Sequence, residues 1–362
     1  MKNIWRRILL APFSLIYGSI TTIRNWLFDK EILSSKTFDL PIISIGNLAI
    51  GGTGKTPHVE FLLSFLKNDL KMAVLSRGYK RKTKGFLLAD SESTYNEIGD
   101  EPYQIATKNL DVIVAVDEKR VHGVNQLIAQ FPELQTIILD DAFQHRQIKP
   151  GLSILLTDIN NMYTSDSHLP GGNLRERRKG AIRADMIVIT KCPLDLKPIE
   201  IRLIEKDFTL KPYQSLFFSS FEYSEIQPVF PELIIEKWDF SKISNLNTSV
   251  LLITGIVSPL AILEHIQNYT NKVEKIFYPD HYSFQKSDFI KIEKLFLNIQ
   301  TQFKLIIVTE KDAARLISNP NLPATLKPYL YVIPIKVKIL NNQEEVFKQK
   351  IINHVTEDSR NS

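Results

Sequence analysis

The chain is nearly devoid of cysteine. Its 362 residues include one, Cys192, so no disulfide bond can form within the chain. A small secreted fold stabilised by disulfides is therefore excluded, and the single thiol fits a reducing cytoplasm. Neither a zinc-finger pattern nor an RNA-recognition signature is present, so no motif favours nucleic acid as a partner.

An uninterrupted apolar run of about 20 residues, the length that a membrane-spanning helix needs, is also missing. The longest run, residues 8–23, is shorter and contains Pro12. Cations and aromatic residues flank it, and no cleavage site of small residues follows, which argues against a signal peptide. We expect residues 1–28 to form an amphipathic helix associated with a membrane surface. A helix of the protein core is the alternative.

Composition otherwise indicates a soluble globular protein, with 44% hydrophobic and 23% charged residues. The length suggests two domains. A net charge of +5 is compatible with an anionic partner, whether a phosphorylated substrate, a lipid headgroup or nucleic acid, and does not choose among them.

The most informative segment is residues 43–57, ISIGNLAIGGTGKTP. It predicts a buried strand, a glycine-rich turn, and a helix with Pro57 in its first turn. Such a turn directs backbone N–H groups towards phosphate. The general P-loop pattern G-x-x-x-x-G-K-[ST] has glycine where this chain has Ala49. The residues expected to hold the nucleotide are Ala49, Ile50, Gly51, Gly52, Thr53, Gly54, Lys55 and Thr56, with Lys55 on the β- and γ-phosphates and Thr56 on Mg²⁺.

Acidic residues supply further candidates. The apolar segment 136–139 ends in Asp140 and Asp141, as in a strand that delivers a carboxylate to Mg²⁺ beside a P-loop. Asp100 opens a predicted helix, where it is either an N-cap or a general base for an acceptor hydroxyl. Arg175 could stabilise the transferring phosphoryl group and Glu176 could join the metal ligands, although an exposed salt bridge explains this pair equally well.

A basic loop follows the second predicted strand. Loops at the carboxyl ends of parallel strands surround the ligand crevice. Cations there are candidates for binding an anionic acceptor, with a solvated basic loop as the alternative. The candidates are Arg77, Lys80, Arg81 and Arg120.

From residue 40 onward, strand-like and helix-like segments alternate, which predicts right-handed βαβ units. We expect an α/β fold: a P-loop NTPase-like, mainly parallel sheet flanked by helices, with a second, smaller α/β domain. The expected divisions are the N-terminal helix at 1–28, a P-loop domain at 29–220, a linker with a candidate β-hairpin at 221–247, and the smaller domain at 248–362.

Two motifs that this chain matches only in part limit the class of nucleotide-binding protein to which it can belong. A guanine site has [NT]-K-x-D, but Thr190-Lys-Cys-Pro193 ends in proline, so ATP is favoured over GTP. ATPases that dimerise around nucleotide carry a lysine where this chain has Ile50. A membrane-associated P-loop ATPase acting in assembly or regulation remains the alternative function, together with a non-catalytic nucleotide sensor.

Taken together, the motifs resemble those of the tetraacyldisaccharide 4′-kinase family, the lipid A 4′-kinases. They run in order over most of the chain: APFSLIYG at 11–18, GGTGKTP at 51–57, SRGY at 76–79, GDEP at 99–102, DDAFQH at 140–145, LPGGNLRE at 169–176, ADMIVITK at 184–191, TGI at 254–256, PDH at 279–281 and TEKD at 309–312.

The resemblance implies a kinase that transfers the γ-phosphate of ATP to the 4′-hydroxyl of a tetraacylated glucosamine disaccharide 1-phosphate, making lipid IVA. It implies action at the cytoplasmic face of the bacterial inner membrane, with Mg²⁺, without nucleic acid, and as a monomer. The family's catalytic carboxylate and histidine map onto Asp100 and His281, one from each domain, a pairing that the residues alone do not reveal. Lys55 and Arg175 are expected to assist in catalysis.

The remaining implied roles concern the metal and the acceptor. The metal candidates are Thr56, Asp140, Asp141, Glu101 and Glu176, and the substrate-binding candidates are Arg77, Arg81, Arg120, Gln144 and Asn173.

Overall fold

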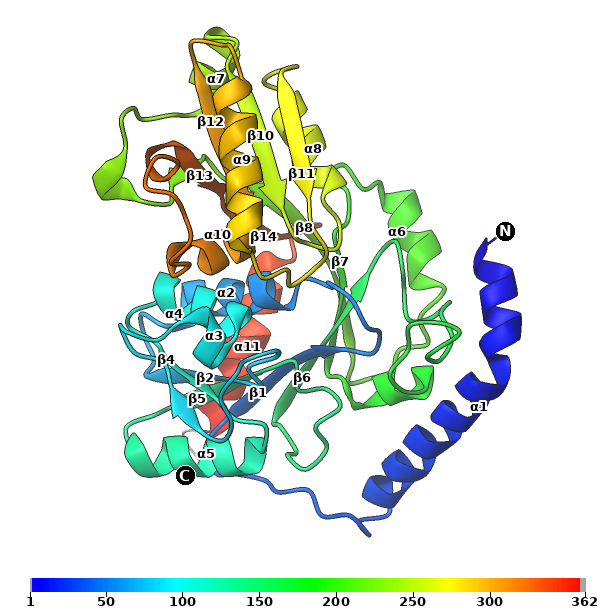
Figure 1. The fold of residues 1–362 in the computed structure, drawn as a ribbon. Helices are drawn as coiled ribbons and strands as arrows, with labels where there is room; N and C mark the ends of the chain where they lie inside the picture. Colours follow the sequence, from blue (N-terminus) through cyan, green and yellow to red (C-terminus); the bar gives the residue numbers. More distant parts are fainter. Residues whose placement is uncertain (1, 359–362) are drawn as a thin grey trace.

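Two β-sheets organise the molecule, a computed structural model that describes residues 2–358 (Figure 1). The larger sheet has the strand order β14-β8-β7-β6-β1-β5-β2-β4-β3, and the smaller one has the order β11-β10-β12-β13-β9. We call the nine-stranded sheet with its packed helices the larger unit, and the five-stranded sheet with its packed helices the smaller unit. The prediction of a mainly parallel sheet flanked by helices, with a second α/β sheet, is confirmed.

The strands of the larger sheet are β1 (Ile42–Asn47), β2 (Met72–Ser76), β3 (Leu87–Leu88), β4 (Ile113–Val116), β5 (Thr136–Asp140), β6 (Leu152–Asp158), β7 (Met186–Thr190), β8 (Ser215–Tyr223) and β14 (Ile335–Ile339). Those of the smaller sheet are β9 (Gln227–Pro228), β10 (Ser249–Thr254), β11 (Val273–Phe277), β12 (Lys304–Thr309) and β13 (Leu330–Ile333). The α-helices are α1 (Lys2–Asp29), α2 (Lys55–Leu66), α3 (Tyr95–Ile98), α4 (Asp100–Lys108), α5 (Arg120–Gln130), α6 (Pro198–Glu205), α7 (Phe240–Asn245), α8 (Leu260–Gln267), α9 (Lys286–Asn298), α10 (Glu310–Ile317) and α11 (Glu344–Asp358).

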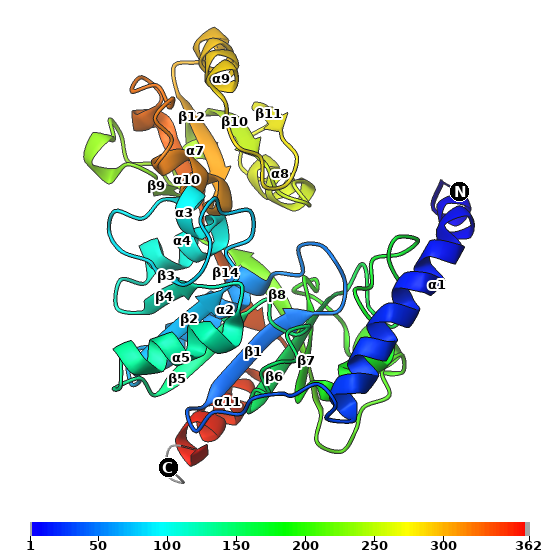
Figure 2. The ribbon, with the colours of Figure 1, turned by 60° about the horizontal axis from the view of Figure 1, so that its bottom comes forward.

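The central strand of the larger sheet is β1, which pairs in parallel with β5 on one side and β6 on the other. All six of its residues are buried, because helices cover both faces of the sheet (Figure 2). The strand ends at the glycine-rich turn, so the turn and the end of β5 lie at the same edge of the sheet. This edge is where a doubly wound sheet binds its ligands.

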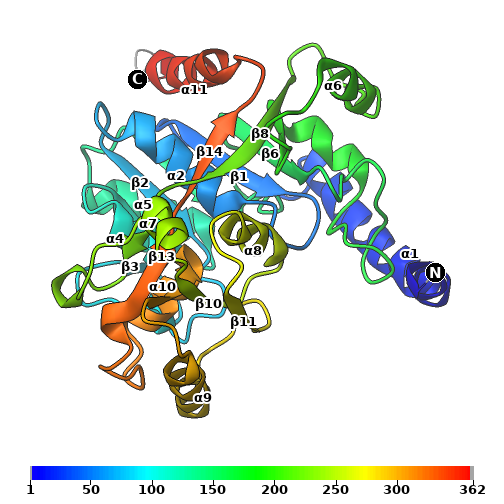
Figure 3. The same ribbon diagram turned by 90° about the horizontal axis from the view of Figure 1, so that it is seen from above.

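The C-terminal segment returns to the larger unit. Strand β14 pairs antiparallel with β8, and α11 buries Phe347 and Ile351 in the same core as Leu62 and Leu63 of α2. Figure 3 shows α11 on the larger sheet, away from the smaller one. Residues 335–358, which the sequence analysis assigned to the smaller domain, therefore pack with the larger sheet.

The segment expected to be a linker also differs. In place of a hairpin within residues 221–247, β8 extends to Tyr223 and pairs with β14, while β9 pairs with β13 of the smaller sheet. The two connections between the units are thus the antiparallel strands β8 and β14. The residues that pair between β8 and β14 are more than 100 positions apart in the sequence, so no local sequence pattern indicates this pairing.

Helix α1 lies along the outside of the larger unit (Figures 1 and 2). One side is docked: Tyr17 donates a hydrogen bond to the carbonyl of Arg175 (3.1 Å), and the Ser14 hydroxyl accepts one from the N–H of Gly171 (2.9 Å). The opposite side exposes Leu9, Phe13, Ile16, Ile20 and Ile23, which recur at helical spacing. This exposure excludes a core helix. None of the helices in residues 2–358 combines the length and the hydropathy that a membrane-spanning helix requires.

Candidate active site

The glycine-rich turn between β1 and α2 has the geometry of a phosphate loop. Gly51 (φ 117°) and Gly54 (φ 85°) adopt backbone conformations that favour glycine. A side chain at Gly54 would also collide with the ring of Phe221. Lys55 and Thr56 begin α2 and are almost fully buried. The helix end and its lysine together form a site for a polyphosphate.

Neighbouring elements fix the backbone of this loop. The N–H of Ile50 donates to the carbonyl of Asn173 (2.8 Å), and the Thr190 hydroxyl donates to the carbonyl of Thr53 (2.9 Å). Asn173 was expected to bind substrate, but its side-chain amide donates to Asp166 (2.9 Å). The contacts of Asn173 therefore support the phosphate loop rather than an acceptor.

His58 holds the loop from within α2. Its Nδ1–H donates to the carbonyl of Gly54 (2.8 Å), and its Nε2 accepts from the Ser219 hydroxyl (3.0 Å). Burial lowers the pKa of His58 from 6.5 to about 4, and the hydrogen bond to Gly54 offsets only part of this effect. The imidazole is thus neutral in the folded protein at pH 7.

Acidification is expected to destabilise the protein through His58. Because the folded-state pKa is depressed, the stability that this group contributes is complete above about pH 6.5 and is lost as the pH falls towards 4. The expected loss over this window is about 3 kcal/mol of unfolding free energy. Urea unfolding of the wild type and of His58→Gln at pH 7, 5.5 and 4.5 measures it. The variant should lose less stability on acidification, and equal slopes would contradict the assignment.

The two carboxylates after β5 lie in different environments. Asp140 is fully buried; its Oδ2 lies 3.4 Å from the Ser76 hydroxyl, and its Oδ1 has no hydrogen-bond partner among residues 2–358. Burial, followed by the charges of Glu101 and Asp141, raises the pKa of Asp140 to about 7. An unpartnered buried carboxylate oxygen is unfavourable unless a cation satisfies it, so Asp140 fits a Mg²⁺ ion.

Asp141 instead pairs with cations of the protein. Its Oδ1 lies 3.7 Å from Nζ of Lys55 and 3.1 Å from Nη1 of Arg175. Burial acts to raise the pKa of Asp141, but these two cations outweigh it and the pKa is lowered. Asp141 therefore holds Lys55 and Arg175 at the phosphate loop. Among the described residues, no group of three His, Cys, Asp or Glu side chains could hold a metal ion alone.

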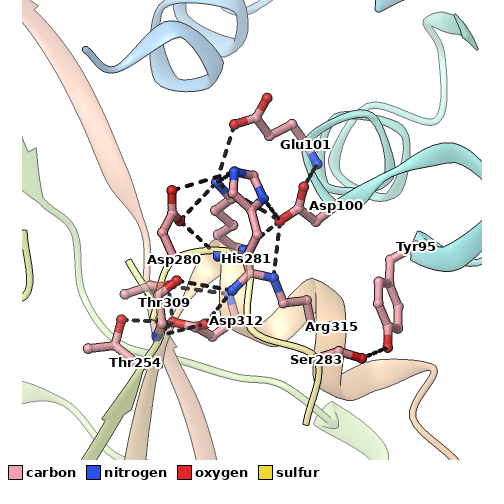
Figure 4. Close-up of polar contacts among 12 residues, drawn as sticks. Tyr95, Asp100, Glu101, Thr254, Asp280, His281, Ser283, Thr309, Asp312 and Arg315 are labelled. Atoms are coloured by element: carbon pink, nitrogen blue, oxygen red, sulfur yellow. Dashed lines mark hydrogen bonds and ion pairs between the residues drawn. The ribbon is translucent and has the colours of Figure 1, made fainter. Parts of the chain in front are cut away.

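A second cluster forms where the two units meet (Figure 4). Asp100, the first residue of α4, is 6% exposed, and its Oδ2 lies 2.9 Å from Nδ1 of His281 in the loop after β11. The N-cap position of α4 is Gly99, so Asp100 is not an N-cap. Burial opposes ionisation, but the hydrogen bond from His281 and the charges of Lys311 and Arg315 hold the pKa of Asp100 well below its usual range.

Lys311 of α10 joins this cluster. Its Nζ lies 3.2 Å from Nε2 of His281, 3.3 Å from Oε1 of Glu101 and 3.4 Å from Oδ1 of Asp280. With Nδ1–H donating to Asp100, Nε2 of His281 is an acceptor for the Lys311 ammonium. Sequence reasoning did not single out Lys311 or Arg315, although both lie in or just after the TEKD motif.

The predicted acceptor-binding cations divide into two groups. Arg77 is exposed at the carboxyl end of β2. Arg81 forms an ion pair with Glu118 (2.8 Å), and Arg120 is 2% exposed, with Nη1 donating to the carbonyl of Asp117 (2.6 Å). Burial lowers the pKa of Arg120 to about 10. In this arrangement Arg81 and Arg120 contact groups of the protein, whereas the other two candidates, Arg77 and Lys80, are exposed.

Gln144 and Glu176 are likewise engaged internally. The Gln144 amide donates to the carbonyl of Asn47 (2.7 Å), and its oxygen accepts from Arg175 (3.3 Å). Both carboxylate oxygens of Glu176 accept from Arg183 (2.8 and 2.9 Å), and Oε2 also accepts from Asn25 of α1 (2.5 Å). These contacts favour a role for Glu176 in docking α1 over the expected role as a metal ligand.

A phosphate loop, an adjacent buried carboxylate and a carboxylate–imidazole pair define a P-loop phosphotransferase. The sequence profile of the family described as "Tetraacyldisaccharide-1-P 4′-kinase" matches residues 6–356. The chain belongs to the tetraacyldisaccharide 4′-kinase family. It is an enzyme, and the predicted resemblance and kinase class are confirmed.

Individual relatives agree with this assignment. A protein named tetraacyldisaccharide 4′-kinase from Bacteroides thetaiotaomicron is 48% identical over 360 residues, which cover 98% of this chain and 94% of that relative. One from Flavobacterium johnsoniae is 43% identical over 359 residues, covering 98% and 99%. The crystal structure of LpxK from Aquifex aeolicus in complex with ATP superposes with a TM-score of 0.73 at 30% identity, covering 96% of this chain and 99% of that chain.

Proposed function

We propose that this protein transfers the γ-phosphate of ATP to the 4′-hydroxyl of a tetraacylated glucosamine disaccharide 1-phosphate and thereby produces lipid IVA. The main support for this proposal is the 2.9 Å contact between Oδ2 of Asp100 and Nδ1 of His281, which come from different units. The same molecule has a phosphate loop. The solved relative that contains ATP supports the choice of nucleotide.

The larger unit supplies the nucleotide site. Loop N–H groups and Lys55 bind the β- and γ-phosphates, while the Thr56 hydroxyl and Asp140 hold Mg²⁺. When bound, the ion neutralises charge on the β- and γ-phosphate oxygens. Arg175, held by Asp141, adds a second positive charge beside Lys55. These groups stabilise the charge that is redistributed in the transition state.

Asp100 orients the acceptor. The 4′-hydroxyl oxygen attacks the γ-phosphorus, the bond from this phosphorus to the ADP oxygen breaks, and the hydroxyl proton passes to the Asp100 carboxylate. The low pKa of Asp100 makes it a weak base. Phosphoryl transfer depends mainly on positioning and charge stabilisation, so a weak but well-oriented base is adequate. Arg77, exposed at the same sheet edge, is the candidate for the anionic part of the acceptor.

Helix α1 brings the enzyme to its lipid substrate. Its exposed apolar side lies opposite the docked side, as expected for a helix on a membrane surface. We place the protein peripherally at the cytoplasmic face of the bacterial inner membrane, where ATP is present.

Charged residues on the exposed side of α1 are expected to release the protein from lipid. The triple variant Phe13→Asp, Ile16→Asp, Ile20→Asp should bind phospholipid vesicles at least tenfold more weakly, because burying carboxylates in the interface is unfavourable. Co-sedimentation with vesicles measures this. A matched control is Ile290→Asp with Leu297→Asp, two exposed positions on α9 of the smaller unit. Equal binding by the triple variant and wild type would refute the membrane role of α1.

The product identifies the reaction. After incubation with ATP, Mg²⁺ and the tetraacyldisaccharide 1-phosphate, ³¹P NMR should show a second phosphomonoester on the lipid, and mass spectrometry of fragments should place it on the 4′-position. Release of inorganic phosphate without any lipid product would instead support an ATPase acting in assembly or regulation.

A further inference from the structure

Arg315 is an unusually buried cation in the cluster around Asp100. It is 2% exposed, yet its guanidinium reaches both units (Figure 4). On one side Nη1 donates to Asp312 (3.0 Å) and to the carbonyl of Gly255 (3.1 Å). On the other side Nε donates to Oδ2 of Asp100 (3.0 Å), and Nη2 donates to the same oxygen. The planar fork thus joins the smaller unit to the first residue of α4.

Asp312 fixes Arg315 from behind. This carboxylate is fully buried and accepts hydrogen bonds from the hydroxyls of Thr254 (2.8 Å) and Thr309 (2.6 Å) and from the N–H of Gly255 (3.0 Å). These donors come from the ends of β10 and β12, two paired strands of the smaller sheet. Because every hydrogen-bonding direction of the carboxylate is occupied, Asp312 and therefore the Arg315 plane have one orientation.

The donors to Asp100 converge on a single oxygen. His281 and both Arg315 nitrogens contact Oδ2, whereas Oδ1 accepts the N–H of Glu101 (3.0 Å). The carboxylate therefore cannot rotate while the smaller unit is docked. A buried ion pair by itself contributes little net stability, so this fully bonded arrangement is better explained by orientation than by stabilisation.

The same network reaches the phosphate loop. Gly255 begins the segment that carries Val257, and a Cβ placed on Gly52 would lie 3.7 Å from Cγ2 of Val257. The backbone of Gly255 both accepts from Arg315 and donates to Asp312. One hydrogen-bonded unit thus links the segment beside the phosphate loop to the Asp100 carboxylate.

We propose that Arg315, held by Asp312, is a positioning residue that sets the orientation of the Asp100 carboxylate when the smaller unit docks over the nucleotide site. The inference rests on the proposed function of Asp100 as the group that receives the hydroxyl proton. Lysine cannot replace Arg315, since one ammonium does not span Asp312 and Asp100 with the geometry of a fork.

The test distinguishes an effect of Arg315 on the orientation of Asp100 from effects on the docking of the two units and on folding. Arg315→Gln should lower kcat about a hundredfold and leave the KM for ATP within threefold, because misplacing a reacting group affects turnover rather than nucleotide binding. Arg315→Lys keeps the buried charge and should still lower kcat at least tenfold. Lys108→Met is the matched control: Lys108 also joins the units, through Glu60 and Glu310, but does not contact Asp100. It should change kcat by less than threefold.

A double-mutant comparison shows whether Arg315 acts through Asp100. In an Asp100→Asn background, Arg315→Gln should lower kcat by less than threefold, since the group that it positions is gone. Multiplicative losses would overturn the inference, as would full activity of both Arg315 variants alongside an inactive Asp100→Asn. Full activity of Asp100→Asn would instead refute the proposed role of Asp100 as the group that receives the hydroxyl proton. Thermal melting of each variant identifies unfolded protein, and Arg315→Lys decides the question if Arg315→Gln does not fold.

Discussion

Replacing Asp100 with asparagine is expected to lower kcat about a thousandfold while the dissociation constant for ATP changes less than threefold. In the proposed mechanism the carboxylate receives the proton of the attacking hydroxyl, and proton transfer by a positioned group typically contributes 10²- to 10⁴-fold. Asp100 belongs to α4, whereas the phosphates are bound by the loop before α2. Steady-state kinetics with a lipid acceptor, and calorimetric titration with a non-hydrolysable ATP analogue, measure the two quantities.

The control for this substitution is Asp111→Asn, which removes a surface carboxylate that pairs with Lys67 at 3.1 Å. Surface pairs of this kind contribute little, so the control should have wild-type kinetics. If Asp100→Asn lost ATP binding, the role of Asp100 would be structural and the base assignment would be wrong.

Replacing Lys55 with alanine is expected to lower kcat/KM for ATP by about 10²- to 10³-fold. In the proposed mechanism Lys55 binds the β- and γ-phosphates, and removing one such preorganised donor typically has an effect of this size. The substitution also leaves Arg175 as the cation that pairs with Asp141 within 4 Å among the described residues. Nucleotide affinity should therefore fall together with turnover, in contrast to Asp100→Asn.

Lys67→Ala provides the comparison for Lys55, because Lys67 directly follows the same helix and pairs with Asp111 at the surface. It should leave kcat/KM within twofold of the wild type. A Lys55→Ala enzyme with unchanged nucleotide kinetics would show that the glycine-rich turn is not the phosphate site.

The sequence predicts those features of the fold and site that depend on residues close together in the chain. The phosphate loop follows from residues 51–56 because glycine, a positive backbone φ and a helix N-terminus are properties of neighbouring residues. The acidic pair after β5 follows from an apolar strand ending in two carboxylates. The amphipathic nature of α1 follows from its helical spacing, and its exposed side agrees with that pattern. The role of each of these features remains a prediction for experiment.

Contacts between distant segments could not be predicted from local patterns. Asp100 and His281 are separated by 181 residues, and only the family resemblance predicts that they form a pair. Asp100 and Arg315 are separated by 215 residues, and nothing in a short motif indicates that a helix containing Lys311 and Arg315 would face a carboxylate at the start of a helix in the other unit.

The contacts of basic side chains are also beyond what the sequence shows. Arg81 and Arg120 are candidates for binding the acceptor because loops at this sheet edge surround ligands. In the structure Arg81 pairs with Glu118, and Arg120 packs beneath Asp140, with Nη2 3.4 Å from its carbonyl. A guanidinium next to buried carboxylates stabilises their charge from within the protein, and sequence alone does not distinguish this from a guanidinium that faces a ligand.

The most direct test of the account is transfer of labelled γ-phosphate from ATP–Mg²⁺ to tetraacyldisaccharide 1-phosphate in mixed micelles, with inorganic phosphate release followed in the same samples. We expect a labelled bisphosphorylated lipid from the wild type, little from Lys55→Ala or Asp100→Asn, and little phosphate release when the acceptor is omitted. Rapid phosphate release that is independent of the acceptor, without labelled lipid, would contradict the account and favour an ATPase.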